Sequence, residues 1–158
     1  MLEECKNVSE YWQGVDQLIK RWLGERQALL DAYYDVGNIV IEHLDDVEAL
    51  TRLRTFCQIL MDYISAGHFE VYGQLVKEGR VFADNNAKLA ETLYASIIKN
   101  TEAVVNFNDT YDTDQHCHVA ISKLPTALAQ LGVLLKERFV VEDKLIDALH
   151  TAHRNLLG

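Results

Sequence analysis

Apolar positions between residues 53 and 75 recur at steps of three and four, the spacing of one face of an α-helix. A second stripe beside this face mixes aromatic, acidic and small residues, as is typical where a helix meets a partner or another helix. The first stripe consists of Leu53, Phe56, Leu60, Ile64, Gly67, Val71 and Leu75, and the second of Asp62, Ser65, Phe69, Tyr72 and Val76. The pattern predicts a helix from about Asp46 to Lys77 that can bend at Gly67. The second stripe indicates either a helix covered on both sides or one with a docking face.

The same periodicity predicts helices in most of the remaining chain. They are expected over residues 2–13, over 15–34, from about Asp84 to Asn108 and from Thr113 to about Arg154. Residues 35–46 are expected to form a connection, in which the run 39–41 is strand-like but too short for a sheet. Pro125 either begins the last helix after a short turn or kinks it. The sequence therefore predicts one all-α domain over residues 1–158, a mostly antiparallel helical bundle of four long helices plus a short N-terminal helix.

Charge and cysteine content narrow the class of partner and the compartment. Fifteen Lys and Arg residues against twenty-four Asp and Glu residues give a net charge of −9, which disfavours direct contact with nucleic acid and favours a basic protein partner. The three cysteines, Cys5, Cys57 and Cys117, are odd in number and widely spaced, which favours a reducing compartment. Without a basic, apolar leader or a long apolar run, we expect a cytoplasmic protein with no membrane contact.

Four polar residues lie on helical stripes that are otherwise apolar: Arg26, His68, Arg138 and Glu142. Arg138 and Glu142 are four residues apart, so they can pair on one helix face. One interpretation is a polar pocket that binds a ligand or transfers a proton, and the other is a structural network that fixes helix register. No nucleophile or glycine-rich loop accompanies these residues. We therefore expect no enzymatic activity, no catalytic residue and no cofactor.

Two other groups have chemically suggestive residue types. His116, Cys117 and His118 lie near Asp112 and Asp114, but adjacent helical side chains point about 100° apart, so we expect no metal site. His68 is compatible with a histidine-phosphotransfer bundle. However, Phe69, Glu70 and Tyr72 surround it with bulk and negative charge, whereas a phosphoacceptor needs exposure and basic neighbours.

Three long blocks of the sequence read LIKRWLGERQALLDAYY from Leu18, FCQ followed by DYISAGHFEVYGQLV from Asp62, and LGVLLKERFVVEDKLI from Leu131. These blocks resemble the Rsd/AlgQ family of bacterial anti-sigma factors and are closer to its AlgQ side. They occur in the family's order and extend over nearly the whole chain. This resemblance implies a regulator that binds the C-terminal domain of the primary, sigma-70 class sigma factor of RNA polymerase. Binding there blocks use of that domain by the polymerase core and by promoter DNA.

The resemblance also implies a contact surface. Asp62 is expected to face an arginine of the sigma domain, with Ser65, Phe69 and Tyr72 beside it. Further candidates from the preceding helix are Trp22, Leu23, Arg26 and Leu30. Arg138 and Glu142 are assigned to a buried polar network, and His68 fits either the network or the surface. The alternative function is a ligand-binding or histidine-phosphotransfer bundle with a polar pocket around His68, Arg26, Arg138 and Glu142.

Overall fold

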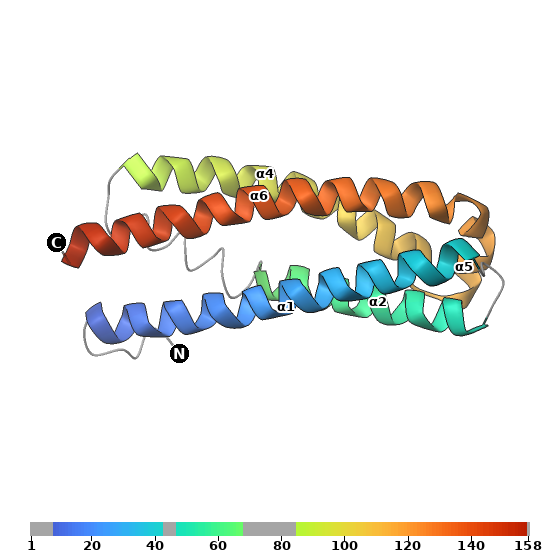
Figure 1. Cartoon of the computed structure of the whole chain (residues 1–158). Coiled ribbons are helices and arrows are strands. Elements are labelled where there is room, and N and C mark those ends of the chain that lie inside the picture. The colour runs from blue at the N-terminus through green and yellow to red at the C-terminus, as the bar shows by residue number, and fades with distance from the viewer. Residues whose placement is uncertain (1–7, 43–46, 68–84, 158) are drawn as a thin grey trace.

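The computed structural model describes residues 8–42, 47–67 and 85–157, and every element in these ranges is helical (Figure 1). This confirms the predicted all-α bundle. The helices run through the described residues in this order: α1 Val8–Glu42, α2 Val47–Ala66, α4 Asn85–Tyr111, α5 Asp114–Ala120, the 3₁₀ turn η3 Ile121–Lys123 and α6 Leu124–Leu157.

The four long helices α1, α2, α4 and α6 run alternately up and down (Figure 1). The most extensive helix contacts join α1 to α2 and α4 to α6, while α2–α4 and α1–α6 contacts are fewer. The bundle therefore consists of two antiparallel helix pairs packed against each other. The start of α1 and the end of α6 lie at the same end of the molecule, and α5 and η3 form the turn at the opposite end.

Helix α1 corrects two predictions within the described residues. Residues 8–13 belong to the same helix as residues 15–34 rather than to a separate short helix, and residues 35–42 continue this helix rather than forming a connection. The helix continues without interruption through Gly14, Gly24 and Gly37 to Glu42. Val36 is buried and Ile39 packs against the core, so the inward stripe of the helix extends past the point where the sequence indicated a turn. A helical glycine is less favourable than alanine by about 1 kcal/mol, a penalty that such burial offsets.

Helix α2 confirms the inward stripe predicted from periodicity. Leu53, Phe56, Leu60 and Ile64 are all buried in the core. The helix is regular to Ala66, and Gly67 adopts a π-helical turn at its end. The predicted continuation to Lys77 lies outside the described residues.

The chain after α4 differs from the single helix predicted from Thr113. Thr113 does cap a helix, since its side chain accepts a hydrogen bond from the His116 N–H at 3.1 Å, but that helix ends at Ala120. After η3, α6 begins at Leu124 with Pro125 in its first turn, where a missing N–H removes no helical hydrogen bond. Of the two possibilities for Pro125, the structure selects the helix start rather than the kink.

Candidate functional site: a buried polar network beside an exposed α2 surface

A buried carboxylate connects three helices near the middle of the bundle. The Tyr63 hydroxyl on α2 donates a hydrogen bond to Glu142 Oε1 on α6 at 2.7 Å. Arg26 on α1 donates from Nε to the Tyr63 hydroxyl at 3.1 Å, and its Nη2 lies 3.6 Å from Glu142 Oε1. Glu142 has 0% of its surface exposed, so these partners replace the water that its charge would otherwise require.

Arg138 extends this network to α4. Its Nε lies 3.6 Å from Glu142 Oε2, and its Nη1 donates to Asn100 Oδ1 at 3.0 Å and to Thr101 Oγ1 at 2.9 Å. Asn100 in turn donates to the carbonyl oxygen of Leu134 at 2.8 Å. Arg138 is 1% exposed. All four long helices therefore contribute to one connected set of polar side chains.

The charges of this network are balanced at its outer end. Arg26 Nη1 pairs with Asp143 Oδ1 at 2.7 Å, and the Asp143 side chain is exposed. Two guanidinium groups thus face two carboxylates, one buried and one at the surface. The Arg26 guanidinium also lies 4.7 Å from the centre of the Phe139 ring and 5.7 Å from that of Trp22, positions that allow cation–π attraction.

The protonation states favour a structural role over proton transfer. Burial raises the pKa of Tyr63, and the neighbouring Glu142 charge raises it further, so the phenol remains a neutral donor. Burial by itself lowers the pKa of Arg26, but attraction to Tyr63, Asp143 and Glu142 outweighs it and the net pKa is raised. Arg26 therefore stays charged at every physiological pH.

The residues predicted from α1 occupy three different environments. Trp22 is only 2% exposed and stacks on Tyr63 with ring centres 5.5 Å apart, which differs from the expectation that it lies on a contact surface. Arg26, one turn later on the same face, joins the network. Leu23 is 36% exposed, and Leu30 is half-buried beside a groove between α1 and α6. Helical geometry explains the difference, because positions 22 and 26 share a face that turns toward α2.

On α2, Asp62 and Ser65 are exposed. The Asp62 carboxylate accepts one hydrogen bond from Gln58 on the same helix at 3.0 Å. Tyr63, the next residue, points inward to the buried network. The exposed acid and the buried hydroxyl therefore belong to adjacent residues, whose side chains leave the helix about 100° apart. Phe69, Tyr72 and His68 lie outside the described residues, so their predicted roles stay predictions.

Sequence reasoning missed four members of the network: Tyr63, Asn100, Thr101 and Asp143. Asn100 and Thr101 lie between the buried residues Ile97 and Val104, so a polar pair inside an apolar α4 stripe was the available signal. Tyr63 gave no comparable signal, because its ring fits an apolar stripe and only its hydroxyl is polar.

Two of the residues considered for a metal site, His116 and Cys117, have different surroundings. The Cys117 thiol is fully buried and donates to the carbonyl oxygen of Tyr111 at 3.2 Å. His116 is exposed and its Nδ1 lies 2.7 Å from Asp112 Oδ1. Among the side chains that the structure describes, no three potential ligands gather around one point. Cys57 is also a free, buried thiol, and burial raises its pKa to about 12.

The fold and the acidic composition place the chain among acidic four-helix bundles whose interior charges bond to one another. Within that class the chain belongs to the Rsd/AlgQ family, described as regulators of the RNA polymerase sigma(70) subunit, which it matches over residues 1–150. This confirms the family assignment made from the three sequence blocks. No described helix has the length and apolarity needed to span a membrane.

Two relatives illustrate how far the similarity extends. Regulator of sigma D from Pectobacterium atrosepticum is 32% identical over 155 residues, covering 95% of this chain and 99% of the relative. Regulator of sigma D from Salmonella schwarzengrund is 33% identical over 165 aligned positions, covering 98% and 97%. The alignments therefore extend over essentially the full length of both proteins.

Proposed function

We propose that this protein is an anti-sigma regulator of transcription that binds the C-terminal domain of the primary sigma factor in the cytoplasm. Binding withholds that domain from the polymerase core and from promoter DNA, and the protein itself makes no direct contact with nucleic acid. The observation that carries the proposal is the family match over residues 1–150. The net charge of −9 supports it, because a sigma domain that binds DNA is basic and attracts an acidic partner.

The proposed contact surface is centred on Asp62. Its carboxylate is exposed and retains oxygen lone pairs beyond the bond from Gln58, so it can accept hydrogen bonds from an arginine of the partner. Ser65 lies one turn further along the same face. Trp22 on α1 stacks on Tyr63 on α2. The residues next to them in the chain, Leu23 and Asp62, therefore lie at the same height along the bundle. Leu23 and Leu30 supply apolar area on α1, and Phe69 and Tyr72 are expected to extend the surface.

In this proposal Arg26 and Trp22 hold α2 in position and do not themselves contact the sigma factor. Both hold Tyr63 in place, and the backbone of Tyr63 continues directly into Asp62. The buried network therefore fixes the position of α2 against α1 and α6. A partner then meets an acidic group on a helix that has little freedom to rotate.

The first experiment measures binding of the full chain to the isolated C-terminal domain of the primary sigma factor by isothermal titration calorimetry. Asp62→Ala should weaken binding at least about 30-fold, since truncating one member of a desolvated charge pair costs about 2 kcal/mol or more. Asp109→Ala is the matched control, because this aspartate is also exposed and lies on a different helix, in the last turn of α4. The control should bind as the unmodified protein does.

The outcomes separate the function from the interface. Absence of binding at low salt, where electrostatic attraction is strongest, contradicts the proposed function. Tight binding that is equal in both variants keeps the function and removes Asp62 from the interface. Binding should also weaken as salt increases from 50 to about 300 mM, the response of oppositely charged surfaces.

A further inference from the structure

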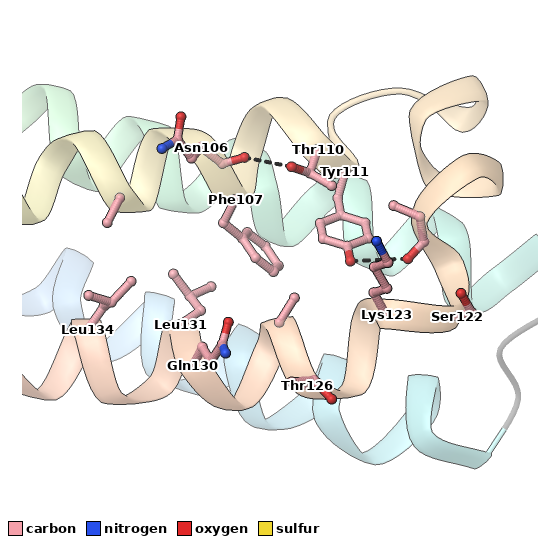
Figure 2. A pocket seen from close by; sticks show the side chains of 13 residues that line it. Asn106, Phe107, Thr110, Tyr111, Ser122, Lys123, Thr126, Gln130, Leu131 and Leu134 are labelled. Atoms are coloured by element: carbon pink, nitrogen blue, oxygen red, sulfur yellow. Dashed lines mark hydrogen bonds between the residues drawn. The ribbon is translucent and has the colours of Figure 1, made fainter.

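A second candidate site, separate from the buried network, lies at the end of the bundle where η3 connects α5 to α6. There a cavity of about 530 Å³ opens between α4 and α6 (Figure 2). This volume falls within the range of about 300–1,000 Å³ typical of small-molecule sites. None of the buried charged residues of the network lines the cavity.

The floor of this cavity is apolar and buried. Phe107 on α4 and Leu131 on α6 point toward each other across it, and both are buried (Figure 2). The Tyr111 ring lies 4.9 Å from the Phe107 ring, and its hydroxyl donates to the carbonyl oxygen of Ala120 at 3.2 Å. The floor is thus a fixed hydrocarbon and aromatic surface, suited to an apolar chain.

The rim of the cavity is polar and its side chains are exposed. They come from both long helices and from the turn between them: Asn106, Ser122, Thr126 and Gln130. In the described part of the chain, these four side chains make no hydrogen bond with another residue. They contrast with the network side chains, whose hydrogen-bonding groups face one another. Their amides and hydroxyls are available to a bound molecule.

The charge of the lining is unusual for this chain. Lys123 is the one charged residue among the residues that line the cavity, and no acidic residue lines it, although the chain has a net charge of −9. Within the described residues, the Lys123 ammonium group forms no ion pair. An unpaired cation beside an apolar floor attracts an anion and repels a cation.

We propose that this cavity binds a small amphipathic monocarboxylate. The hydrocarbon chain of the ligand lies on Phe107 and Leu131, and its carboxylate pairs with Lys123. One charge suits one ammonium group, and the neutral amide and hydroxyl groups of the rim hydrogen-bond the remaining polar atoms. This binding site is separate from the proposed sigma contact, because the described residues of that surface lie on α1 and α2 and none of them lines the cavity.

The test is a calorimetric titration of the full chain with decanoate at submicellar concentration, followed by octanoate and hexanoate. Each methylene removed should weaken binding about fourfold, the factor expected for hydrocarbon buried on the floor. Decanol and decyltrimethylammonium have the same chain with a neutral and a cationic head. We expect the carboxylate to bind most tightly and the cation least. Lack of saturable decanoate binding, or equal affinity for the three heads, overturns the proposal.

Two variants locate the site. Lys123→Gln should weaken decanoate binding about tenfold and leave decanol unchanged, whereas Lys136→Gln, an exposed lysine in the α1–α6 groove, should change neither. Ala127→Phe fills the cavity and should abolish binding of both. Equal decanoate binding by the two lysine variants overturns the assignment.

A measurement on the unmodified protein covers the case in which Ala127→Phe does not fold, as judged by circular dichroism. Nuclear Overhauser contacts between the decanoate chain and the methyl groups of Leu131 are then measured. Their presence supports the site, and their absence under saturating decanoate overturns it.

Discussion

Two arginine clusters in this protein have similar chemistry and opposite settings. Arg52 lies on the surface of α2, where its guanidinium pairs with Asp35 and Glu48 at 2.9 Å each. Arg138 is enclosed in the bundle, where its Nε lies 3.6 Å from Glu142. The exposed ion pairs are shorter, yet water solvates their members equally well when the pairs break. The buried charges have no such substitute, so the consequence of losing a partner depends on burial more than on distance.

The largest effect is expected when Glu142 is removed. Glu142→Ala leaves Arg26 and Arg138 without the carboxylate between them and should lower the free energy of unfolding by about 3–5 kcal/mol. Urea unfolding followed by circular dichroism measures the change. Asp143→Ala is the control, since it removes the exposed partner of Arg26 and should have a much smaller effect. Equal losses from the two variants contradict the argument from burial.

Tyr63→Phe tests the neutral member of the network. The hydroxyl donates to a buried carboxylate and accepts from a guanidinium, so its loss should lower the free energy of unfolding by about 1.5–3 kcal/mol. The ring and its stacking on Trp22 remain. Tyr34→Phe is the comparison variant, because Tyr34 is largely exposed and its hydroxyl should contribute little. A loss for Tyr63→Phe no larger than that for Tyr34→Phe counts against the hydrogen-bond geometry.

Gly132→Ala perturbs packing between α6 and α1 without changing a charge. A Cβ at this position clashes with the hydroxyl end of Tyr33, which is held there by donating to the Leu128 carbonyl oxygen at 2.9 Å. The expected loss of unfolding free energy is about 1–3 kcal/mol. Gly24→Ala should instead raise the free energy of unfolding, because no atom lies within 4 Å of the new methyl group and alanine is the better helix former. Thermal melting of both variants measures the difference.

The smallest effect is expected for Arg52→Ala. Its pKa is raised by the hydrogen bond that it donates to Glu48 and by attraction to Asp35, yet the guanidinium is solvated and the pairs are screened by salt. The urea midpoint should therefore move less than in Glu142→Ala, Tyr63→Phe or Gly132→Ala, and the remaining shift should vanish in high salt. A shift as large as that of Tyr63→Phe contradicts the comparison between the two clusters.

The inward faces of the helices were predictable, because buried helix faces require apolar residues at steps of three and four along the sequence. Leu53, Phe56 and Leu60 illustrate this on α2. The length of α1 was not predictable from local signals, since glycines and the β-branched residues near Ile39 favour other conformations. Packing of Val36 in the core overrides those preferences, and this packing depends on residues distant in the chain.

The network shows the same limit at the level of the site. Arg138 and Glu142 are four residues apart, so helical geometry alone indicated their pairing. Tyr63 lies 79 residues from Glu142, and Arg26 lies 117 residues from Asp143. These contacts depend on the order in which the helices pack. Sequence reasoning therefore identified the charged members on their stripes but not the set of partners around them.

The division of the bundle into two helix pairs has a consequence for folding. Contacts within α1–α2 and within α4–α6 join segments that are near in sequence, so each pair forms rapidly at a small loss of chain entropy. The fewer contacts between the pairs must then form across long stretches of chain. Glu142 lies on the boundary between the two pairs. It accepts a hydrogen bond from Tyr63 in the α1–α2 pair and lies beside Arg138 in the α4–α6 pair. A single buried carboxylate thereby couples the opening of one hairpin to that of the other, so their slowest amide protons should exchange with solvent at a common rate.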